Sequence, residues 1–277
     1  MDSVPEAFES PGDAAEFKRP AHRAGIELYR AHIVHHAFEP HAHEGFGLGA
    51  IEAGVERFRY RGSEHLAPPD SLVLMNAGEL HTGRAETAQG WRYRMVYVEP
   101  EVVAAVTGER GWHFTHAVGH DPQRARRVGR LLQQLWSASE PLAFDSLLFT
   151  LLAELRVHAR VAQPAAAEGA LRFAPVVEYM RAFAGERLTL EQLAAVAGLS
   201  PFHFLRRFKA TYHATPQQML MALRLLEAKR RLAAGEAPAQ AAAAAGLADQ
   251  AHLTRAFARR YGVTPALYQR QLRSTRR

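Results

Sequence analysis

The sequence predicts a multidomain α+β protein, with an N-terminal antiparallel β-barrel or sandwich, a helical segment after it, and an all-helical C-terminal domain. Apolar residues alternate with period two before Pro100 and recur with a helical period after it. The charge changes sign between the two halves of the chain. A length of 277 residues, 48% of them hydrophobic, is enough to bury two cores.

The charge is unevenly distributed along the chain. Residues 171–277 contain 17 Lys and Arg against 6 Asp and Glu, whereas residues 1–170 contain 17 against 22. A basic domain favours a polyanionic partner, because the counterions released from phosphates contribute a large part of nucleic-acid affinity. A basic surface that only maintains solubility is the alternative.

The composition also excludes several classes of protein. The chain has no cysteine, which excludes disulfides and thiolate zinc sites. Its first residues lack the basic-then-apolar order of a signal peptide, and no segment reaches the ~18 apolar residues of a membrane span. We therefore expect a cytoplasmic protein with no membrane partner.

Short strands are expected within residues 21–100, after a flexible tail formed by residues 1–20, which show no clear period. Four segments alternate polar and apolar residues: 46–54, 56–62, 71–78 and 91–100. Short alternating strands separated by turns are typical of an antiparallel barrel or sandwich. In the second segment Arg57 and Arg59 flank Phe58 and so share one face of the strand.

Residues 101–161 are expected to be a helical segment that packs on the barrel or forms a dimer interface. Segments 122–139 and 141–161 have the pattern of amphipathic helices. The second carries its leucines on one stripe: Leu147, Leu148, Leu151, Leu152 and Leu155. Residues 162–170 are small, polar and contain Pro and Gly, so we place the domain linker there.

The C-terminal domain, residues 171–277, has clear helix boundaries. Thr189 and Gln192 form a capping box, Gly198 ends that helix, and Ser200-Pro201 begins the next. Two helices joined by a short turn predict a helix-turn-helix unit over residues 189–212.

A second unit of the same design is predicted over residues 238–262, with a break at Gly246 and an N-cap at Asp249. Between the units a helix over residues 216–234 is about 28 Å long, which can hold two reading helices near the ~34 Å separation of successive major grooves. Two tandem units on a basic domain favour DNA binding over the alternative, a helical protein-interaction domain.

The reading helix of each unit buries an apolar stripe, formed by Phe204 and Phe208 in the first and by Leu253 and Phe257 in the second. The candidate DNA-binding residues lie on the outward faces: Phe202, His203, Leu205, Arg206, Lys209, Gln250, Ala251, His252, Arg255 and Arg259.

Different chemistry is expected within this set. Arg206, Gln250 and Arg255 are candidates for base reading, since Arg and Gln pair bidentately with guanine and adenine. Lys209 and the pair Arg259-Arg260 are expected to contact phosphates.

The segments "LTLEQLAAVAGLSPFHFLRRFK" and "DQAHLTRAFARRYGVTPALYQR" resemble the DNA-binding domain of the AraC/XylS family of bacterial regulators over residues 171–272. The resemblance implies seven helices, two helix-turn-helix units on one face of double-stranded DNA, and activation or repression through RNA polymerase. Its base-contacting positions fall on these residues: Phe202, Leu205, Arg206, Gln250, Ala251, His252 and Arg255. The helix before Gly246 departs from the family as an alanine run, which buries less area, so we expect looser packing there.

The N-terminal segments "PHAHEGFGLGAIEAG" and "SLVLMNAGELHTG" resemble the small cupin barrel that many members of this family carry as an effector sensor. His41, His43 and His81 match the arrangement by which metal-binding cupins hold iron, manganese or zinc. The glutamate of that pattern is missing, because Gly47 and Leu48 stand at its expected positions. We therefore expect no metal cofactor, with a three-histidine site left as an alternative.

These histidines, together with Arg57 and Arg59, are the candidate effector-pocket residues. An inward orientation of the two arginines would favour a carboxylate effector, whereas an outward one would make them a solvated face. The sequence favours a non-enzymatic, sequence-specific DNA-binding regulator that senses a small molecule and is a possible homodimer. A metal-dependent cupin enzyme fused to a helical domain is the rival interpretation.

Overall fold

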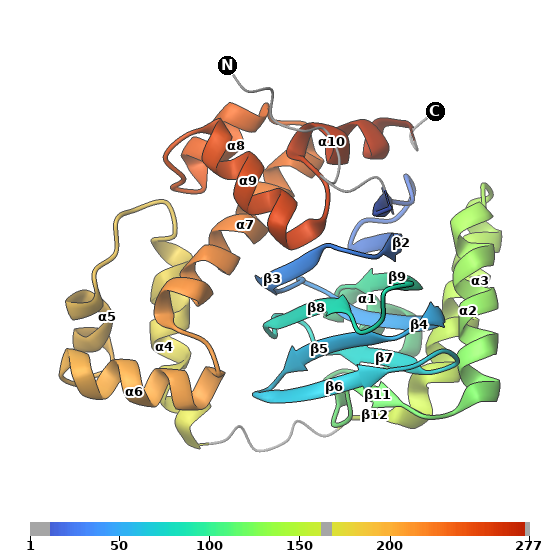
Figure 1. Cartoon of the computed structure of the whole chain (residues 1–277), viewed down its shortest axis with the longest axis horizontal. Helices are drawn as coiled ribbons and strands as arrows, with labels where there is room; N and C mark the ends of the chain where they lie inside the picture. Colours follow the sequence, from blue (N-terminus) through green and yellow to red (C-terminus); the bar gives the residue numbers. More distant parts are fainter. Residues whose placement is uncertain (1–11, 162–167, 275–277) are drawn as a thin grey trace.

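The computed structural model describes residues 12–161 and 168–274. A β-rich domain is followed by a helical domain (Figure 1). Most of the predicted linker, residues 162–167, lies outside the described residues, and residues 168–170 belong to a helix instead.

The predicted tail is partly wrong. Residues 1–11 lie outside the described residues, but β1 (Ala14–Lys18) pairs antiparallel with β2 (Ile26–Ile33). Ala15 and Phe17 alternate with more exposed neighbours on β1 and are buried, so this short segment contributes one apolar face to the sheet.

Two antiparallel sheets form the N-terminal barrel. The larger sheet has the order β1-β2-β9-β4-β7-β11, and the smaller has the order β3-β8-β5-β6. Their further strands are β3 (Ala37–His41), β4 (Phe46–Gly54), β5 (Glu56–Tyr60), β6 (Ser63–Ala67), β7 (Leu72–Met75), β8 (His81–Ala85), β9 (Trp91–Val98) and β11 (Val118–Gly119). All four strand segments predicted from the alternating pattern contain a strand.

Three helices accompany the larger sheet: α1 (Pro100–Thr107), α2 (Pro122–Ser137) and α3 (Pro141–Leu155). Helix α2 packs on β4 and β9, and α3 packs on α2. The predicted leucine stripe of α3 is buried except for the half-buried Leu147. The helix ends before the predicted residue 161, because a short 3-10 turn follows Leu155 and β12 (Ala159–Arg160) then pairs with β10 (His113–Phe114).

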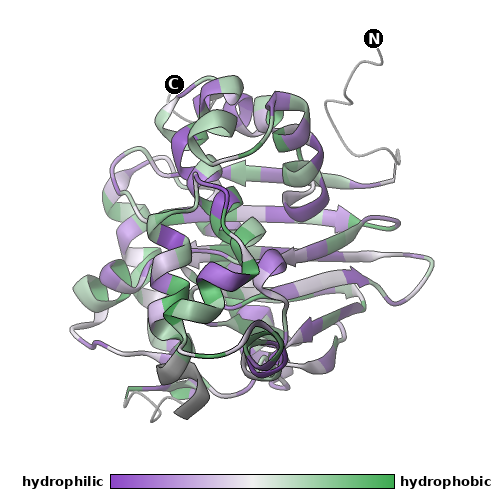
Figure 2. Ribbon diagram, turned by 90° about the vertical axis from the view of Figure 1, so that its left-hand side faces the viewer, coloured by the Kyte–Doolittle hydropathy of each residue, from purple (hydrophilic) through white to green (hydrophobic). Residues whose placement is uncertain are grey.

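The helical domain contains seven helices within residues 168–274, the number that the family resemblance implies. They are α4 (Glu168–Ala182), α5 (Leu190–Val196), α6 (Pro201–Tyr212), α7 (Pro216–Ala234), α8 (Pro238–Ala244), α9 (Gln250–Tyr261) and α10 (Pro265–Ser274). The predicted caps are present, since Thr189 accepts a bond from the Gln192 N–H and Asp249 accepts one from the His252 N–H. In Figure 2, where this domain faces the viewer, its helices carry both hydrophobic and hydrophilic residues.

The two helix-turn-helix units are packed in different ways. The first unit has a core of its own that includes Phe173, Phe204 and Phe208. In the second unit Phe257 belongs to the same buried cluster as the barrel interior, and so does Tyr268 of the following helix, α10. Figure 1 shows the result: α8, α9 and α10 lie over the end of the barrel at β2 and β3, while α5 and α6 lie at the other end of α7.

Candidate DNA interface and barrel cavity

Helix α6 presents its predicted DNA-binding side to solvent. Phe202 is 71% exposed and Leu205 39% exposed, although both are large apolar residues. His203, Arg206 and Lys209 are also exposed on this helix. Exposed apolar side chains beside basic ones suit a major groove, where thymine methyl groups and phosphates are both within reach.

Helix α9 also exposes predicted DNA-binding residues, near its N-terminus. Gln250 and Arg255 are exposed, and Ala251 and His252 are half-buried. The structure therefore leaves the predicted base-reading residues accessible to solvent, Arg206 in the first unit and Gln250 and Arg255 in the second.

In the arginine pair at the end of α9, Arg260 departs from the predicted contact with phosphates. Arg260 is buried, donates from Nε to the Pro40 carbonyl at 3.1 Å and forms an ion pair with Glu39 at 2.8 Å. Its expected role as a phosphate contact is thus wrong for this arrangement, because it attaches α9 to the barrel. Arg259 is mostly exposed and lies 3.5 Å from Glu39.

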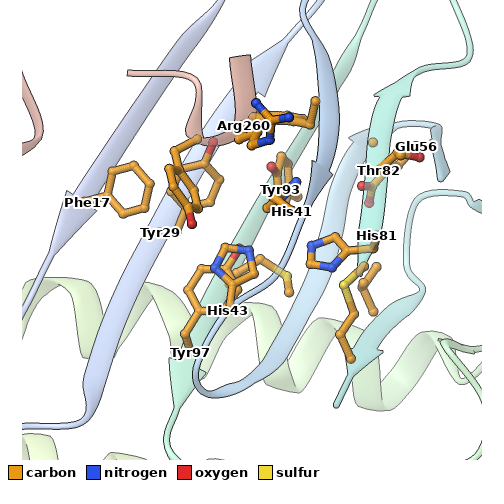
Figure 3. Close-up of a pocket in the computed structure, with 16 residues that line it drawn as sticks. Phe17, Tyr29, His41, His43, Glu56, His81, Thr82, Tyr93, Tyr97 and Arg260 are labelled. Carbon is orange, nitrogen blue, oxygen red and sulfur yellow. The ribbon is translucent and has the colours of Figure 1, made fainter. Parts of the chain in front are cut away.

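A cavity of about 30 Å³ lies inside the barrel next to this contact. Its lining includes Tyr29, Glu56, Tyr93 and Tyr97 from the strands and Arg260 and Tyr261 from α9 (Figure 3). Organic ligands usually occupy cavities of roughly 300–1,000 Å³. In this arrangement the cavity has room for about two water molecules.

The three predicted histidines converge on this cavity (Figure 3). All are buried, and one potential ligand atom of each lies within 4.8 Å of the others. Burial and the neighbouring His81 lower the pKa of His41 well below its ordinary value. Burial also lowers the pKa of His43 well below its ordinary value and that of His81 to about 4, so the rings are neutral at pH 7.

The two candidate effector-binding arginines face away from the cavity. Arg57 forms ion pairs with Glu64 and Glu86, and Arg59 is exposed. Their assignment to the effector pocket is wrong, because alternation along β5 places them opposite the buried Phe58. The inward residue missed by sequence reasoning is Glu56, whose pKa burial raises to about 8.

A second missed feature is a buried ionic cluster between the domains. Lys229 of α7 forms an ion pair with Glu27 of β2, and Tyr268 donates to the same carboxylate at 2.6 Å. Burial alone would raise the pKa of Glu27, but Lys229 and Arg19 lower it to about 2. The sequence contained a signal, since Lys229 lies three residues after Leu226 and four before Ala233, and so shares a helix face with these apolar residues.

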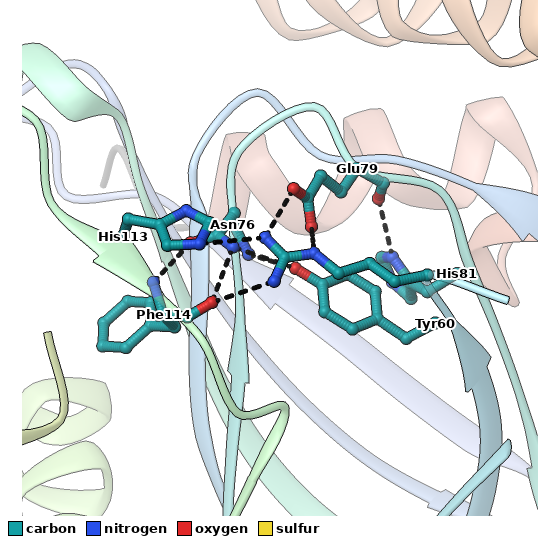
Figure 4. Close-up of polar contacts among 7 residues, drawn as sticks. Tyr60, Asn76, Glu79, His81, His113 and Phe114 are labelled. Carbon is teal, nitrogen blue, oxygen red and sulfur yellow. Dashed lines mark hydrogen bonds and ion pairs between the residues drawn. The ribbon is translucent and has the colours of Figure 1, made fainter. Parts of the chain in front are cut away.

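A polar network holds the β-strand segment that carries His81 (Figure 4). The Arg61 guanidinium donates to both carboxylate oxygens of Glu79, at 2.8 and 2.7 Å, and to the Phe114 carbonyl at 3.2 Å. Asn76 joins the network through hydrogen bonds with Tyr60 and Phe114. The backbone carbonyl of Glu79 accepts from His81 Nδ1 at 3.2 Å.

Both halves of the chain match family models. An AraC-like ligand binding domain matches residues 23–155, and a helix-turn-helix domain matches residues 193–271. The chain belongs to the AraC family. It is a transcriptional regulator that joins a ligand-binding domain to a helix-turn-helix DNA-binding domain.

Relatives and solved structures agree with this assignment. The HTH-type regulator YbfI of Bacillus subtilis is 27% identical over 82% of this chain and 86% of its own length. The MmsAB operon regulatory protein of Pseudomonas aeruginosa is 27% identical over 91% of this chain and 79% of its own. An apo form of ToxT from Vibrio cholerae, carrying a single substitution, has the same two-domain fold, with a TM-score of 0.60 at 9% identity over 92% of this chain and 100% of that one.

Among the described residues, none of the helices combines the length and the apolar character that crossing a bilayer requires.

Proposed function

We propose that this AraC-family regulator reads a specific DNA sequence with α6 and α9, and that a molecule bound in the barrel changes how α9 is presented to DNA. The observation that carries the proposal is the double role of α9. Its N-terminal part exposes Gln250 and Arg255, whereas Arg260 and Tyr261 at its other end line the barrel cavity.

The proposed DNA contacts follow from exposure and side-chain chemistry. Arg206, Gln250 and Arg255 read bases, since their groups pair bidentately with guanine or adenine. Lys209 and Arg259 contact phosphates. The remaining outward residues shape the surface or contact thymine methyl groups and the DNA backbone: Phe202, His203, Leu205, Ala251 and His252.

Effector sensing depends on the contact between α9 and the barrel. A cavity of about 30 Å³ does not accept an organic effector unless its lining moves, and Arg260 and Tyr261 are part of that lining. A ligand shifts an equilibrium only by binding one arrangement better than the other. An effector that needs a larger cavity therefore favours arrangements in which the second unit is displaced from the barrel.

We also propose that the regulator works as a homodimer in the cytoplasm and acts through RNA polymerase. Leu142 of α3 is 80% exposed and Phe149 is 57% exposed. They lie seven residues apart and so share one face of the helix, which supports a second copy of the chain as the partner of that face.

We favour regulation over the metal-dependent enzyme alternative, because both relatives are regulators.

Selection of genomic DNA fragments by the purified full chain, followed by sequencing, tests the proposal. One recurring motif with two half-sites about one helical turn apart is expected. Affinity for that motif should exceed affinity for scrambled DNA at the same salt concentration and should fall as salt rises. Equal affinities for motif and scrambled DNA would contradict sequence-specific reading.

A further inference from the structure

We propose that His41, His43 and His81 form a binding site for one divalent transition-metal ion, of the kind that imidazole ligands prefer, beneath the second reading helix. Zinc, nickel and iron share this chemistry. The proposal goes beyond DNA reading, which requires no metal, and it gives the small barrel cavity an occupant that fits it.

The hydrogen bonds of two histidines leave a lone pair free on each ring. His41 Nδ1 lies 2.8 Å from the Glu39 carbonyl, and His81 Nδ1 lies 3.2 Å from the Glu79 carbonyl. A carbonyl only accepts, so each Nδ1 carries the proton and each Nε2 is an unprotonated acceptor. A hydrogen bond from the ring nitrogen that does not bind the metal is the arrangement that usually orients a metal-binding histidine.

The third histidine contributes an unsatisfied atom. His43 Nε2 is buried without a hydrogen-bond partner among the described residues, and its ring is stacked on Tyr97 with the centroids 3.7 Å apart. Acceptors that converge in a buried site repel one another unless a positive charge or a donor lies between them. With its proton on Nδ1, His43 provides Nε2 as a third acceptor, and a metal ion satisfies all three acceptors together.

The spacing of the histidines suits this role after a small adjustment. One ring nitrogen from each histidine lies within 4.8 Å of the other two. The nitrogen ligands of a tetrahedral zinc ion lie roughly 3.3 Å apart, given bonds of ~2.0–2.1 Å. Movements of the order of 1 Å in the three rings therefore close the set around an ion, while the network of Arg61 and Glu79 holds the segment of His81 (Figure 4).

The size and polarity of the cavity suit an ion that keeps one coordination position for water or a bound molecule. Three neutral imidazoles leave a fourth position, which in such sites is taken by water or by a bound molecule. The cavity of about 30 Å³ has room for about two water molecules, so an ion with one water fills it. The Tyr261 hydroxyl is buried without a partner among the described residues and lines the same cavity, so it can bond to that water.

The location of the site connects the metal to the second reading helix. The Tyr261 ring centroid lies 5.8 Å from that of His41 and 6.0 Å from that of His43. Tyr261 is the last residue of α9, whose N-terminal part carries Gln250 and Arg255. An ion whose water is bonded to Tyr261 would hold α9 on the barrel.

Cobalt titration of the full-length chain, stripped of metal with a chelator, tests the site without DNA, so the result is independent of the proposed function. We expect one equivalent of Co²⁺ and a visible absorption spectrum of nitrogen ligation. His41→Ala and His81→Ala should weaken binding at least 100-fold. The control His116→Ala removes an exposed histidine on the same domain and should bind like the wild type.

A second measurement tests the site even if the alanine variants do not fold. X-ray absorption of its cobalt complex should count three imidazole ligands, and His43→Gln, which keeps most of the side-chain volume, should reduce that number by one. Fewer than three imidazoles in the wild type, no bound cobalt, or equal binding by all folded variants would each overturn the proposal.

Discussion

Lys229 of α7 and Glu27 of β2 form an ion pair that is buried between the helical domain and the barrel. Arg19 donates to the other carboxylate oxygen at 2.8 Å, and the Tyr268 hydroxyl donates to that oxygen at 2.6 Å. One carboxylate of the barrel is therefore neutralised in part by a lysine of the other domain, and the ionic balance of each domain depends on their contact.

Glu27→Gln should destabilise this contact. The substitution leaves Lys229 buried without its opposite charge, and loss of one partner of a buried pair usually lowers the free energy of unfolding by ~3–5 kcal/mol. Urea unfolding measures the loss, and hydrogen exchange should become faster in α9 and α10.

The matched control for that variant is Glu16→Gln. Glu16 pairs with Arg30 at 2.8 Å, but both side chains are well exposed. Such pairs contribute ~0–1 kcal/mol. Equal losses in the two variants would mean that the Lys229 contact does not hold the domains together.

Substitutions on the two reading helices should separate base reading from phosphate binding. Arg255→Ala should lower affinity by about 1–3 kcal/mol at one base position of the selected motif, whereas Lys209→Ala should weaken binding to all sequences. Lys209→Ala should also reduce the slope of log K against the logarithm of the salt concentration by about one. Titrations of single-base variants of the motif at several salt concentrations measure both effects. Uniform weakening by Arg255→Ala would assign that residue to phosphates.

The stability of the barrel should depend on pH through Glu56. Burial raises the folded pKa to about 8, whereas the unfolded group has its ordinary value near 4.5, so the folded carboxyl stays protonated after the unfolded one ionises. The stabilisation present at low pH is therefore lost as pH rises from 5 towards 8. Relative to Glu56→Gln, the wild type should lose about 1.4 kcal/mol of unfolding free energy per pH unit.

Urea unfolding of both proteins at pH 5, 6 and 7 provides this comparison, in which the contributions of the histidines cancel. A difference that stays constant across these pH values would show that Glu56 is ionised in the folded barrel.

Phe149→Glu should shift the chain from dimer to monomer, because it places a charge on the exposed face of α3 that Leu142 shares. Sedimentation velocity at several concentrations measures the change. Leu66→Glu is the control, since Leu66 is 46% exposed on β6 in the other sheet. A wild-type chain that sediments as a monomer at all concentrations would exclude this dimer.

The features that the sequence predicted well are those set by local interactions. Thr189 and Asp249 were predicted as helix caps, and each stands where the structure begins a helix. The histidine cluster was also predicted, from the resemblance to cupins, and the structure pairs His81 with His41 on the neighbouring strand.

The features that the sequence did not predict depend on contacts between distant segments. Arg260 resembles a phosphate-binding residue until β3 provides the Pro40 carbonyl and Glu39 as its partners. The segment around Phe17 is too short to be recognised as a strand until β2 and Tyr268 cover it. The contacts of Arg260 with β3 and of Tyr268 with Phe17 both join segments from opposite ends of the chain, which no local pattern records.

The shared core of α9, α10 and the barrel predicts that the boundary of cooperative unfolding lies inside the helical domain rather than at the predicted linker. Calorimetry should then resolve α4, α5 and α6 as the part that melts separately, while α8 to α10 melt together with the sheets. A fragment cut at the linker would expose Tyr261 and Tyr268, whose rings contact His41 and Phe17 of the barrel, so studies of this regulator are better served by the intact chain than by its separated halves.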